Sequence, residues 1–439
     1  MLSSPDADLC RRDPALPGLQ TLLDPEALTA RVAAASACLP LERFVPSYLR
    51  YKPETNCLVG FTSPDSPQAI SFYGKVYSPN SGKPKGHAAG RGVEPGRVLL
   101  GSDGIDLFFF PTDNRLKLND ILNGSAMWTR VCRELRRKRL GSSKASFTVL
   151  AYRPERRCVL AMVVDNTPVA VLKAYAPAEF RRTSARARAL RTSGSKSFPV
   201  LLVEDEPNRC LVFSWMPGEV LQRSLEKGSH LHSELAQTGA ELAALHRLDA
   251  PALDVRGSKV ESDHVHRVAA MVERLSPNLA EGAATIAGRI SGALEKMPAG
   301  DCTLHGDFGA KQVVAKGESI AFLDFDEAAR GRAATDLGNF VARLEDDVLR
   351  GKIPAESVAP ARAALLGGYE SAGTLPPDRE LALYTAIGLF RVAHEPFRRH
   401  ETEWPSRMGL YLDRVSALLD DADTVDASTN TRARALSQR

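Results

Sequence analysis

A short segment of this chain occurs twice, and an internal repeat constrains a fold more strongly than any local propensity does. The first copy, Tyr51–Val59, reads YKPETNCLV, and the second, Tyr152–Leu160, reads YRPERRCVL. Each copy is followed by an apolar segment with one lysine, Lys75 in FYGKVY and Lys173 in VLKAY. Each then has a later apolar segment that ends at a proline, DLFFFP or CLVFSWMP. The order predicts two copies of a small antiparallel β unit, about 100 residues each.

The pattern becomes helical after the second copy. Leu235, Leu242 and Leu245 share one face of a predicted helix, because helical neighbours recur every three to four residues. We expect a helical linker over 126–140, a long loop over 78–96 and a disordered polar tail over 421–439. Helices are predicted over 178–190, 234–246, 265–275, 283–294, 337–350, 360–371, 379–395 and 407–419.

Composition excludes several classes of function. A net charge of +4 is too small to indicate a nucleic-acid partner, and the basic runs 133–139 and 181–191 are typical of solvated helix faces. The seven cysteines form no C-x-x-C pair, which favours reduced thiols over a zinc site or disulfides. No apolar run is long enough to cross a membrane, and the N-terminus has no signal-peptide pattern. We therefore expect a soluble cytoplasmic protein.

Two acidic segments carry the chemistry. His305–Gln312 reads HGDFGAKQ, and Phe322–Glu327 reads FLDFDE at the end of an apolar segment. Phosphoryl transfer to a hydroxyl needs one carboxylate that accepts the hydroxyl proton and another that binds magnesium at the nucleotide phosphates. Asp307 lies in the first segment, after a glycine that permits a tight turn. Asp324 and Asp326 are expected to point to one side of a strand, since strand side chains alternate.

The spacing H-G-D-x-x-x-x-Q, followed by an apolar residue and Asp-Phe-Asp, resembles the aminoglycoside phosphotransferase and choline kinase family, which has a protein-kinase-like fold. The resemblance covers roughly residues 145–405. It implies that Asp307 is the base, that Asp324 binds Mg²⁺ and that Asp326 supports it. Gln312 stands where the family usually has Asn, a metal ligand. An amide oxygen one methylene further away still permits coordination.

The same resemblance implies nucleotide contacts in the second copy. Lys173 would meet the α- and β-phosphates of ATP. Its helix partner is not evident, since only Glu179 is available, and the turn at 153–157 lacks the glycines of protein kinases. Arg156 or Arg157 would instead face phosphate charge.

The segment FSWMPG resembles the hinge between kinase lobes, where the backbone binds adenine. Trp215 and Met216 lie in it, and plain core residues are the alternative. Asp336, in the later segment TDLG, corresponds to a family aspartate that ties the catalytic loop to the next helix.

These observations predict an α+β, protein-kinase-like bilobal fold with a duplicated β-rich N-lobe unit and a helical C-lobe. We expect an N-terminal repeat module over 1–140, a nucleotide-binding lobe over 141–220 and a helical catalytic lobe over 221–420, before the tail. The first repeat has no acidic loop of its own. It is expected to be a cap, an acceptor-binding module or an assembly module for a homodimer or partner enzyme. A structural remnant of duplication is the alternative.

The predicted activity is transfer of the γ-phosphate of ATP, with Mg²⁺, to a hydroxyl group. The acceptor is expected to be a small molecule or a Ser/Thr of a biosynthetic precursor peptide in natural-product biosynthesis. The locally basic segment HEPFRRHE disfavours a polycation. A non-catalytic pseudokinase or nucleotide-binding partner module is the alternative, because of Gln312 and the missing glycines.

Overall fold

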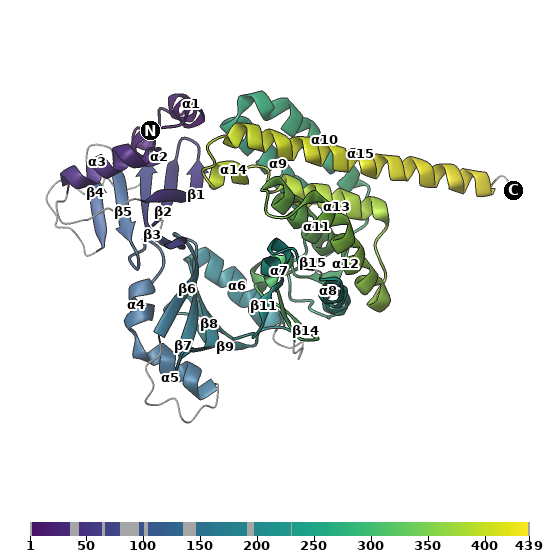
Figure 1. Ribbon diagram of the computed structural model, residues 1–439, viewed down its shortest axis with the longest axis horizontal. Coiled ribbons are helices and arrows are strands. Elements are labelled where there is room, and N and C mark those ends of the chain that lie inside the picture. The colour runs from purple at the N-terminus through teal and green to yellow at the C-terminus, as the bar shows by residue number, and fades with distance from the viewer. Residues whose placement is uncertain are drawn as a thin grey trace. The chain divides into compact units, whose positions relative to one another are not determined.

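The computed structural model describes residues 2–35, 44–63, 66–79, 96–100, 104–134, 146–190, 197–229 and 231–437. The chain forms two compact units, which are described one at a time below (Figure 1). The first unit is rich in β structure and contains both repeats. It comprises Met1–Arg181, Leu201–Trp215 and Glu395–Pro405. The second unit is mainly helical and comprises Arg182–Val200, Met216–His394 and Ser406–Arg439.

Each repeat forms a five-stranded antiparallel sheet, and the strand orders are equivalent: β1-β2-β3-β5-β4 and β6-β7-β8-β10-β9. The predicted duplication is thereby confirmed. The first sheet contains β1 (Val45–Lys52), β2 (Asn56–Ser63), β3 (Ser66–Tyr77), β4 (Arg97–Leu100) and β5 (Ile105–Phe109). The second contains β6 (Ser146–Arg153), β7 (Arg157–Val164), β8 (Thr167–Tyr175), β9 (Leu201–Asp205) and β10 (Cys210–Ser214).

In both repeats, an aspartate forms the same hydrogen bonds to the first turn. In the first repeat, the Asp13 carboxylate accepts hydrogen bonds from the Tyr51 hydroxyl at 2.7 Å and the Glu54 amide at 3.0 Å. In the second, Asp113 accepts from the equivalent tyrosine hydroxyl at 2.7 Å and the Glu155 amide at 2.9 Å. Both glutamates have a φ of 58°. The aspartates fix a left-handed turn that non-glycine residues rarely adopt.

Residues of both repeats share one apolar core. Leu58, Tyr73 and Phe108 of the first repeat belong to the same buried cluster as Leu160 and Leu172 of the second. Since burial of a large apolar side chain contributes about 1.5–3 kcal/mol, neither repeat keeps its full core without the other.

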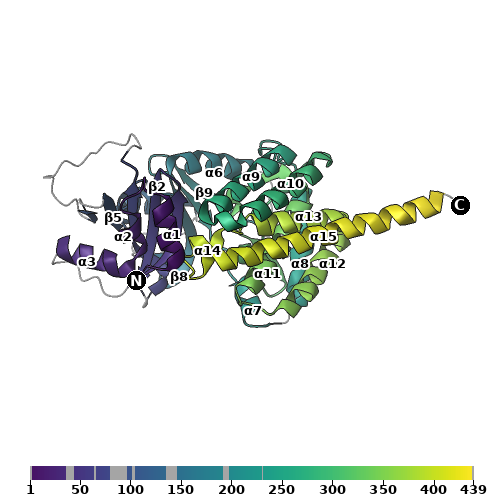
Figure 2. The same ribbon diagram turned by 90° about the horizontal axis from the view of Figure 1, so that it is seen from above.

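Helices surround these sheets within the first unit. Three helices that were not predicted lie beside the first sheet: α1 (Ser4–Arg12), α2 (Leu19–Leu23) and α3 (Pro25–Ala35) (Figure 2). Helix α4 (Leu118–Asn123) precedes the predicted linker, 126–140. The linker begins within α5 (Ser125–Glu134), and its residues 135–140 lie outside the described residues. Most of the loop expected over 78–96 also lies outside them. Helix α14 covers Glu395–Arg398, and helix α6 (Pro177–Leu190) follows β8 and continues into the second unit after Arg181.

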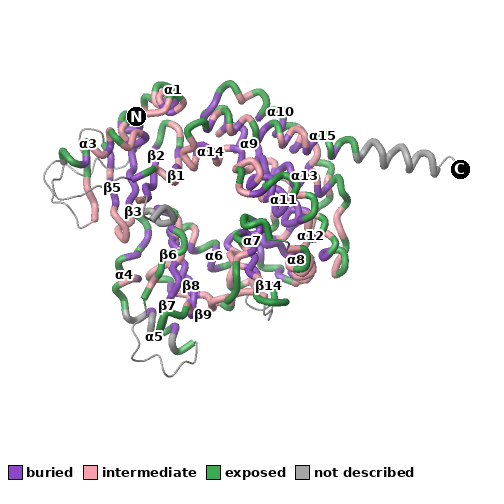
Figure 3. Tube along the Cα trace, in the orientation of Figure 1, coloured by how far each residue is buried: buried purple, intermediate pink, exposed green. Residues whose placement is uncertain are grey.

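The second unit confirms the predicted helical pattern. Its helices are α7 (Leu221–Glu226), α8 (His232–His246), α9 (Ser258–Leu275), α10 (Ala280–Glu295), α11 (Ala334–Leu349), α12 (Val358–Ala372) and α13 (Asp378–Phe390). Short strands carry the acidic loops: β11 (Glu219–Val220), β12 (Cys302–Leu304), β13 (Val313–Lys316), β14 (Ser319–Phe322) and β15 (Ala329–Gly331). The 3₁₀ turns among the described residues of this unit are η2 (Pro277–Leu279), η3 (Ala310–Gln312), η4 (Phe325–Glu327) and η5 (Ala355–Ser357). Helices α11 and α13 are largely buried (Figure 3).

Helix α15 differs from its prediction. It covers Trp404–Ser437 and therefore extends through residues expected to be a disordered tail. Arg289 of α10 pairs with Asp420 at 2.8 Å and Asp423 at 2.7 Å, which holds the point where the polar segment begins. Among the described residues, no helix is both long and apolar enough to cross a membrane.

Candidate active site

The loop with Asp307 connects β12 to η3 and depends on one glycine. Gly306 has a φ of +86°, and an added Cβ would overlap the carbonyl oxygen of Glu327. Both the backbone conformation and the close approach therefore require glycine. The turn leaves the Asp307 side chain 37% exposed, so this carboxylate remains accessible to a substrate.

Asp336, near the start of α11, holds the backbone of that loop. Its carboxylate accepts hydrogen bonds from the amides of His305 at 2.7 Å and Gly306 at 2.9 Å. Its Oδ2 also lies 3.1 Å from His246 Nε2. Burial raises the pKa of Asp336, but the contact with His246 and the donated hydrogen bonds outweigh burial and lower it. Asp336 thus ties the loop to the next helix, as the sequence analysis expected.

Two further residues of α11 hold the loop, and the sequence analysis missed both. Asn339 Nδ2 donates to the Phe308 carbonyl at 2.6 Å, and Arg343 Nη2 donates to Asp307 Oδ1 at 2.8 Å. Asn339 and Arg343 follow Asp336 by three and seven positions, so all three lie on one face of the helix. That periodicity, counted from the expected structural aspartate, was the signal available in the sequence.

The surroundings of Asp307 keep it ionised. Burial raises its pKa, but the guanidinium groups of Arg343 and Arg391 outweigh burial and lower the pKa below 3.8. The charge of Asp324 acts in the opposite direction and raises the Asp307 pKa. The two loops therefore bring these carboxylates within electrostatic range of each other, and Asp307 is ready to accept a proton at neutral pH.

His305 connects the two acidic loops. Its Nε2 lies 2.7 Å from the Leu323 carbonyl oxygen, and its Nδ1 lies 3.4 Å from the Asp307 amide. These two partners are satisfied by the neutral tautomer that carries its hydrogen on Nε2. The residue before Asp324 is thereby held against the loop that contains Asp307.

The expectation that Asp324 and Asp326 lie in a strand was wrong. Strand β14 ends at Phe322, and Asp324 has a φ of 68° and a ψ of 57°, in the left-handed region. Asp326 lies in the following 3₁₀ turn, and its carbonyl accepts a hydrogen bond from Arg186. Aspartate adopts the left-handed conformation more readily than bulky residues do. The chain therefore turns at Asp324, and strand alternation does not apply there.

The acidic residues of the two loops suit Mg²⁺ better than a metal ion whose ligands all come from protein side chains. In the described part of the chain, no group of three or more His, Cys, Asp or Glu residues could form a metal cage. Mg²⁺ is usually bound by one or two carboxylates together with phosphates and water. Asp324, the predicted Mg²⁺ ligand, has such a carboxylate. Gln312 ends η3, its carbonyl accepts a hydrogen bond from Leu323, and its Oε1 faces Gly309 of the Asp307 loop.

The predicted nucleotide residues lie in the first unit, apart from Met216. Lys173 is in β8, is 8% exposed and has its ammonium 5.6 Å from the ring centre of Phe213. Arg156 lies 3.5 Å from Glu179, the only acid that sequence analysis had offered as a partner for the lysine. The chain passes from the first unit to the second between Trp215 and Met216, at the predicted hinge.

The equivalent lysine of the first repeat has a different environment. Lys75 Nζ lies 2.5 Å from Glu155 Oε2, and the two side chains are 2% and 0% exposed. Glu155 belongs to the first turn of the second repeat, and Arg50 and Asn114 also donate to it, at 2.7 and 3.0 Å. Lys75 is thus part of a buried ion pair that joins the two repeats.

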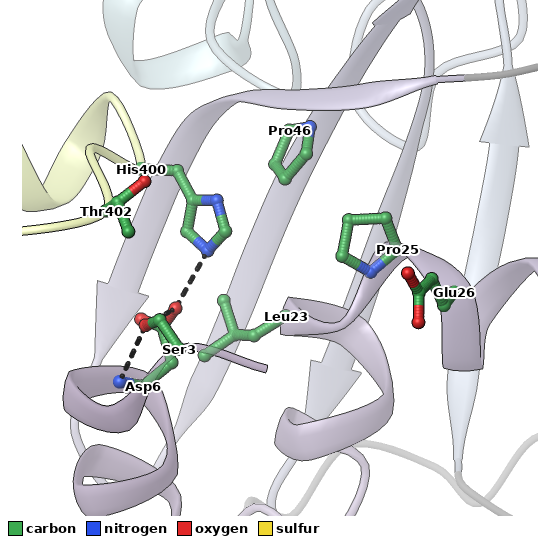
Figure 4. A pocket seen from close by; sticks show the side chains of 8 residues that line it. All are labelled: Ser3, Asp6, Leu23, Pro25, Glu26, Pro46, His400 and Thr402. Carbon is green, nitrogen blue, oxygen red and sulfur yellow. Dashed lines mark hydrogen bonds and ion pairs between the residues drawn. The ribbon is translucent and has the colours of Figure 1, made fainter. Parts of the chain in front are cut away.

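A cavity of about 250 Å³ lies elsewhere in the first unit, between α1, the start of β1 and the residues after α14. Figure 4 shows His400 directed at Asp6, with Pro46 opposite, and the His400 Nε2 to Asp6 distance is 3.2 Å. None of the residues that line the cavity is one of the predicted site residues.

Comparisons with solved structures return distant kinases. A choline/ethanolamine kinase family protein from Mesorhizobium loti is 16% identical, with a TM-score of 0.48 over 67% of this chain and 94% of that one. A choline kinase from Cryptosporidium parvum is 13% identical, with a TM-score of 0.48 over 67% and 96%. A macrolide 2'-phosphotransferase from Brachybacterium faecium is 16% identical, with a TM-score of 0.42 over 62% and 93%.

The sequence itself gives the stronger result. No curated protein matches it. Residues 161–381, however, match the model of the phosphotransferase enzyme family, and they contain Lys173, the Asp307 loop and Asp324. This confirms the predicted class of enzyme, an ATP-dependent kinase with an alcohol acceptor. The chain belongs to the phosphotransferase enzyme family.

Proposed function

We propose that this enzyme transfers the γ-phosphoryl group of Mg-ATP to a hydroxyl group, with Asp307 as the base. The observation that supports this most directly is the support given to the Asp307 loop. Asp336, Asn339 and Arg343 hold its backbone and side chain from one face of α11. His305 joins it to the segment before Asp324. Such preorganisation is what an in-line transfer requires, since phosphoryl transfer depends mainly on positioning and electrostatics.

The chemical step follows from the ionised state of Asp307. The acceptor hydroxyl gives its proton to the carboxylate as its oxygen bonds to the γ-phosphorus, and the bond from that phosphorus to the bridging oxygen of ADP breaks. Asp324 would hold Mg²⁺, with Gln312 and Asp326 as further ligands or supports. When bound, the ion neutralises charge on the nucleotide phosphates. Lys173 would meet the α- and β-phosphates, Arg156 would face phosphate charge, and the backbone near Trp215 and Met216 would bind adenine.

The first repeat has a structural role in this proposal. Lys75 pairs with Glu155 and is thereby committed to holding the first turn of the second repeat. In a nucleotide-binding lobe of this kind, that turn covers the phosphates. We therefore infer that residues 1–140 brace the nucleotide lobe, 141–220, and that the catalytic lobe comprises 221–420. Acceptor binding and assembly with a second copy or a partner enzyme stay further proposals for this repeat.

The acceptor is proposed to be a small molecule with a hydroxyl group. A Ser/Thr hydroxyl of a precursor peptide in natural-product biosynthesis is the second proposal, motivated by the extra N-terminal module. A panel of both kinds of compound, assayed by ADP release and mass spectrometry of the products, separates them.

Substitutions in the two acidic loops test the mechanism. Asp307→Asn should lower turnover by at least about 10²-fold, the usual contribution of a positioned base, and should leave Mg-ATP binding intact. Asp324→Ala should also weaken Mg²⁺-dependent ATP binding. Asp301→Asn is the matched control, since that aspartate precedes the same strand but is 74% exposed. Turnover of Asp307→Asn close to that of Asp301→Asn would remove this loop from the mechanism.

A further inference from the structure

Close packing of two helices places a second arginine beside the Asp307 loop. Gly338 of α11 abuts the backbone of α13 at Tyr384, and Gly388 abuts Ala342 of α11, where an added Cβ would lie 2.7 Å from the Ala342 Cβ. Contacts therefore advance along both helices in the same direction. Arg343 follows Ala342 in α11, and Arg391 directly follows the last residue of α13, so this packing places Arg391 near the part of α11 that contacts Asp307.

The charges around Arg391 are unequal. Two carboxylates face it, Asp307 and Glu261, and each already has an arginine of its own. Arg343 donates to Asp307 at 2.8 Å, and Arg256 donates to Glu261. Arg256 also donates to the Gly306 carbonyl at 2.8 Å, so it is fixed under the loop. Arg343 and Arg256 therefore each donate to one of these two carboxylates, whereas Arg391 acts on both of them only through its charge.

Arg391 is also the arginine of this group whose side chain makes no hydrogen bond or close ion pair with the described residues, although its side chain is partly buried. Burial and the charge of Arg256 lower the pKa of Arg391, as expected for a cation without full compensation. Burial and the charge of Arg391 lower the pKa of His264 to about 4, so this side chain adds no positive charge at neutral pH. A partly buried guanidinium without a fixed partner has its donors available for a planar anion.

We propose that Arg391 binds an anionic group of the acceptor, a carboxylate or a phosphate, and so makes this enzyme a kinase of hydroxy acids or phosphorylated alcohols. The inference rests on the proposed function, because it takes Asp307 to be the base that meets the acceptor hydroxyl. An arginine beside that base would hold the acid group of the acceptor while the hydroxyl faces the Asp307 carboxylate. It would also repel an acceptor that carries ammonium groups.

Acceptors that differ only in charge test the proposal. Full-length enzyme with Mg-ATP is assayed for ADP release with glycerate, glycerol and 3-amino-1,2-propanediol, which are anionic, neutral and cationic. Binding of the same compounds is measured in parallel by thermal shift in the presence of Mg-ADP. We expect glycerate to be preferred in both assays. Arg391→Gln should reduce that preference by at least about tenfold, as expected for loss of a hydrogen bond to a charged group.

Control variants show whether the preference for an anionic acceptor depends specifically on Arg391. Arg362→Gln removes an arginine of α12 that is 41% exposed and should change nothing. Arg391→Lys should retain part of the preference, since the positive charge remains. An equal preference for glycerate in wild type and Arg391→Gln would overturn the proposal, as would a wild-type preference for the cationic compound.

A loss of ATP affinity in Arg391→Gln with an unchanged preference for glycerate would also overturn it, because the arginine would then serve the γ-phosphate. Failure of wild type to bind Mg-ATP would contradict the proposed function instead. In that case, thermal shift without nucleotide still measures whether glycerate binding depends on Arg391.

Discussion

The ion pair between Lys75 and Glu155 gives the most quantitative prediction. Lys75→Met removes the ammonium and keeps a side chain of similar length. The two groups are 2.5 Å apart and almost fully buried. Removing one partner of a buried pair costs roughly 3–5 kcal/mol, because the other charge stays buried. Glu155 keeps Arg50 and Asn114 as donors, so we expect the lower end, about 3 kcal/mol of unfolding free energy.

A double-mutant cycle with Glu155→Gln isolates the pair. Urea unfolding of wild type, both single variants and the double variant should show a coupling energy of at least about 1 kcal/mol. Lys259→Met is the matched control, because that lysine pairs with Asp263 at the surface and is 86% exposed. A Lys75→Met variant as stable as Lys259→Met would refute the reasoning. So would additive effects in the cycle.

The same pair predicts how stability depends on pH. Burial raises the pKa of Glu155, but Lys75, Asn114 and Arg50 outweigh burial and lower it below 4.5. A carboxylate whose pKa is lowered on folding contributes stability above its unfolded pKa, and that stability is lost as pH falls through the folded pKa. The difference in stability between wild type and Lys75→Met should therefore be full at neutral pH and shrink below pH 4.5.

Three further predictions follow from the sites. Lys173→Ala should lower kcat/KM for ATP by roughly tenfold or more, the effect of losing a hydrogen bond to a charged phosphate, and equal defects in Lys75→Ala would mean that the lysines are assigned to the wrong roles. A protein that begins near residue 142 should fail to fold by circular dichroism, because it lacks Lys75, Asp113 and half of the shared core; a cooperative unfolding transition in it would contradict this. The lowered pKa of Asp307 predicts that kcat shows no acid-side inflection from this group between about pH 5 and pH 8, and a shift of such an inflection in Asp307→Glu would disprove it.

Local patterns were sufficient for much of the fold. The paired segments at Tyr51 and Tyr152 predicted two equivalent sheets, because a strand–turn–strand unit is specified by residues close in sequence. Apolar periodicity likewise predicted the helices of the second unit, since each buries a face whose spacing can be counted. The helices α1 to α3 were missed, because short segments with mixed composition form only against the sheet that they cover.

The candidate site also has features that could be predicted from the sequence and features that could not. The identities of Asp307 and Asp324 could be recognised from two short motifs, since each motif is one continuous turn of chain. Their surroundings could not. The left-handed backbone at Asp324 follows from how the loop is held by His305, which contacts it across the fold.

The sequence by itself determined the repeats, the acidic motifs and the class of enzyme, because each depends on residues that are neighbours along the chain. Only the tertiary structure decided that Lys75 meets Glu155, that Arg343 meets Asp307, and that Arg391 has no carboxylate of its own. Charge pairing between distant segments depends on which helix faces come together and how much water they exclude. A pattern of residue types does not contain that information.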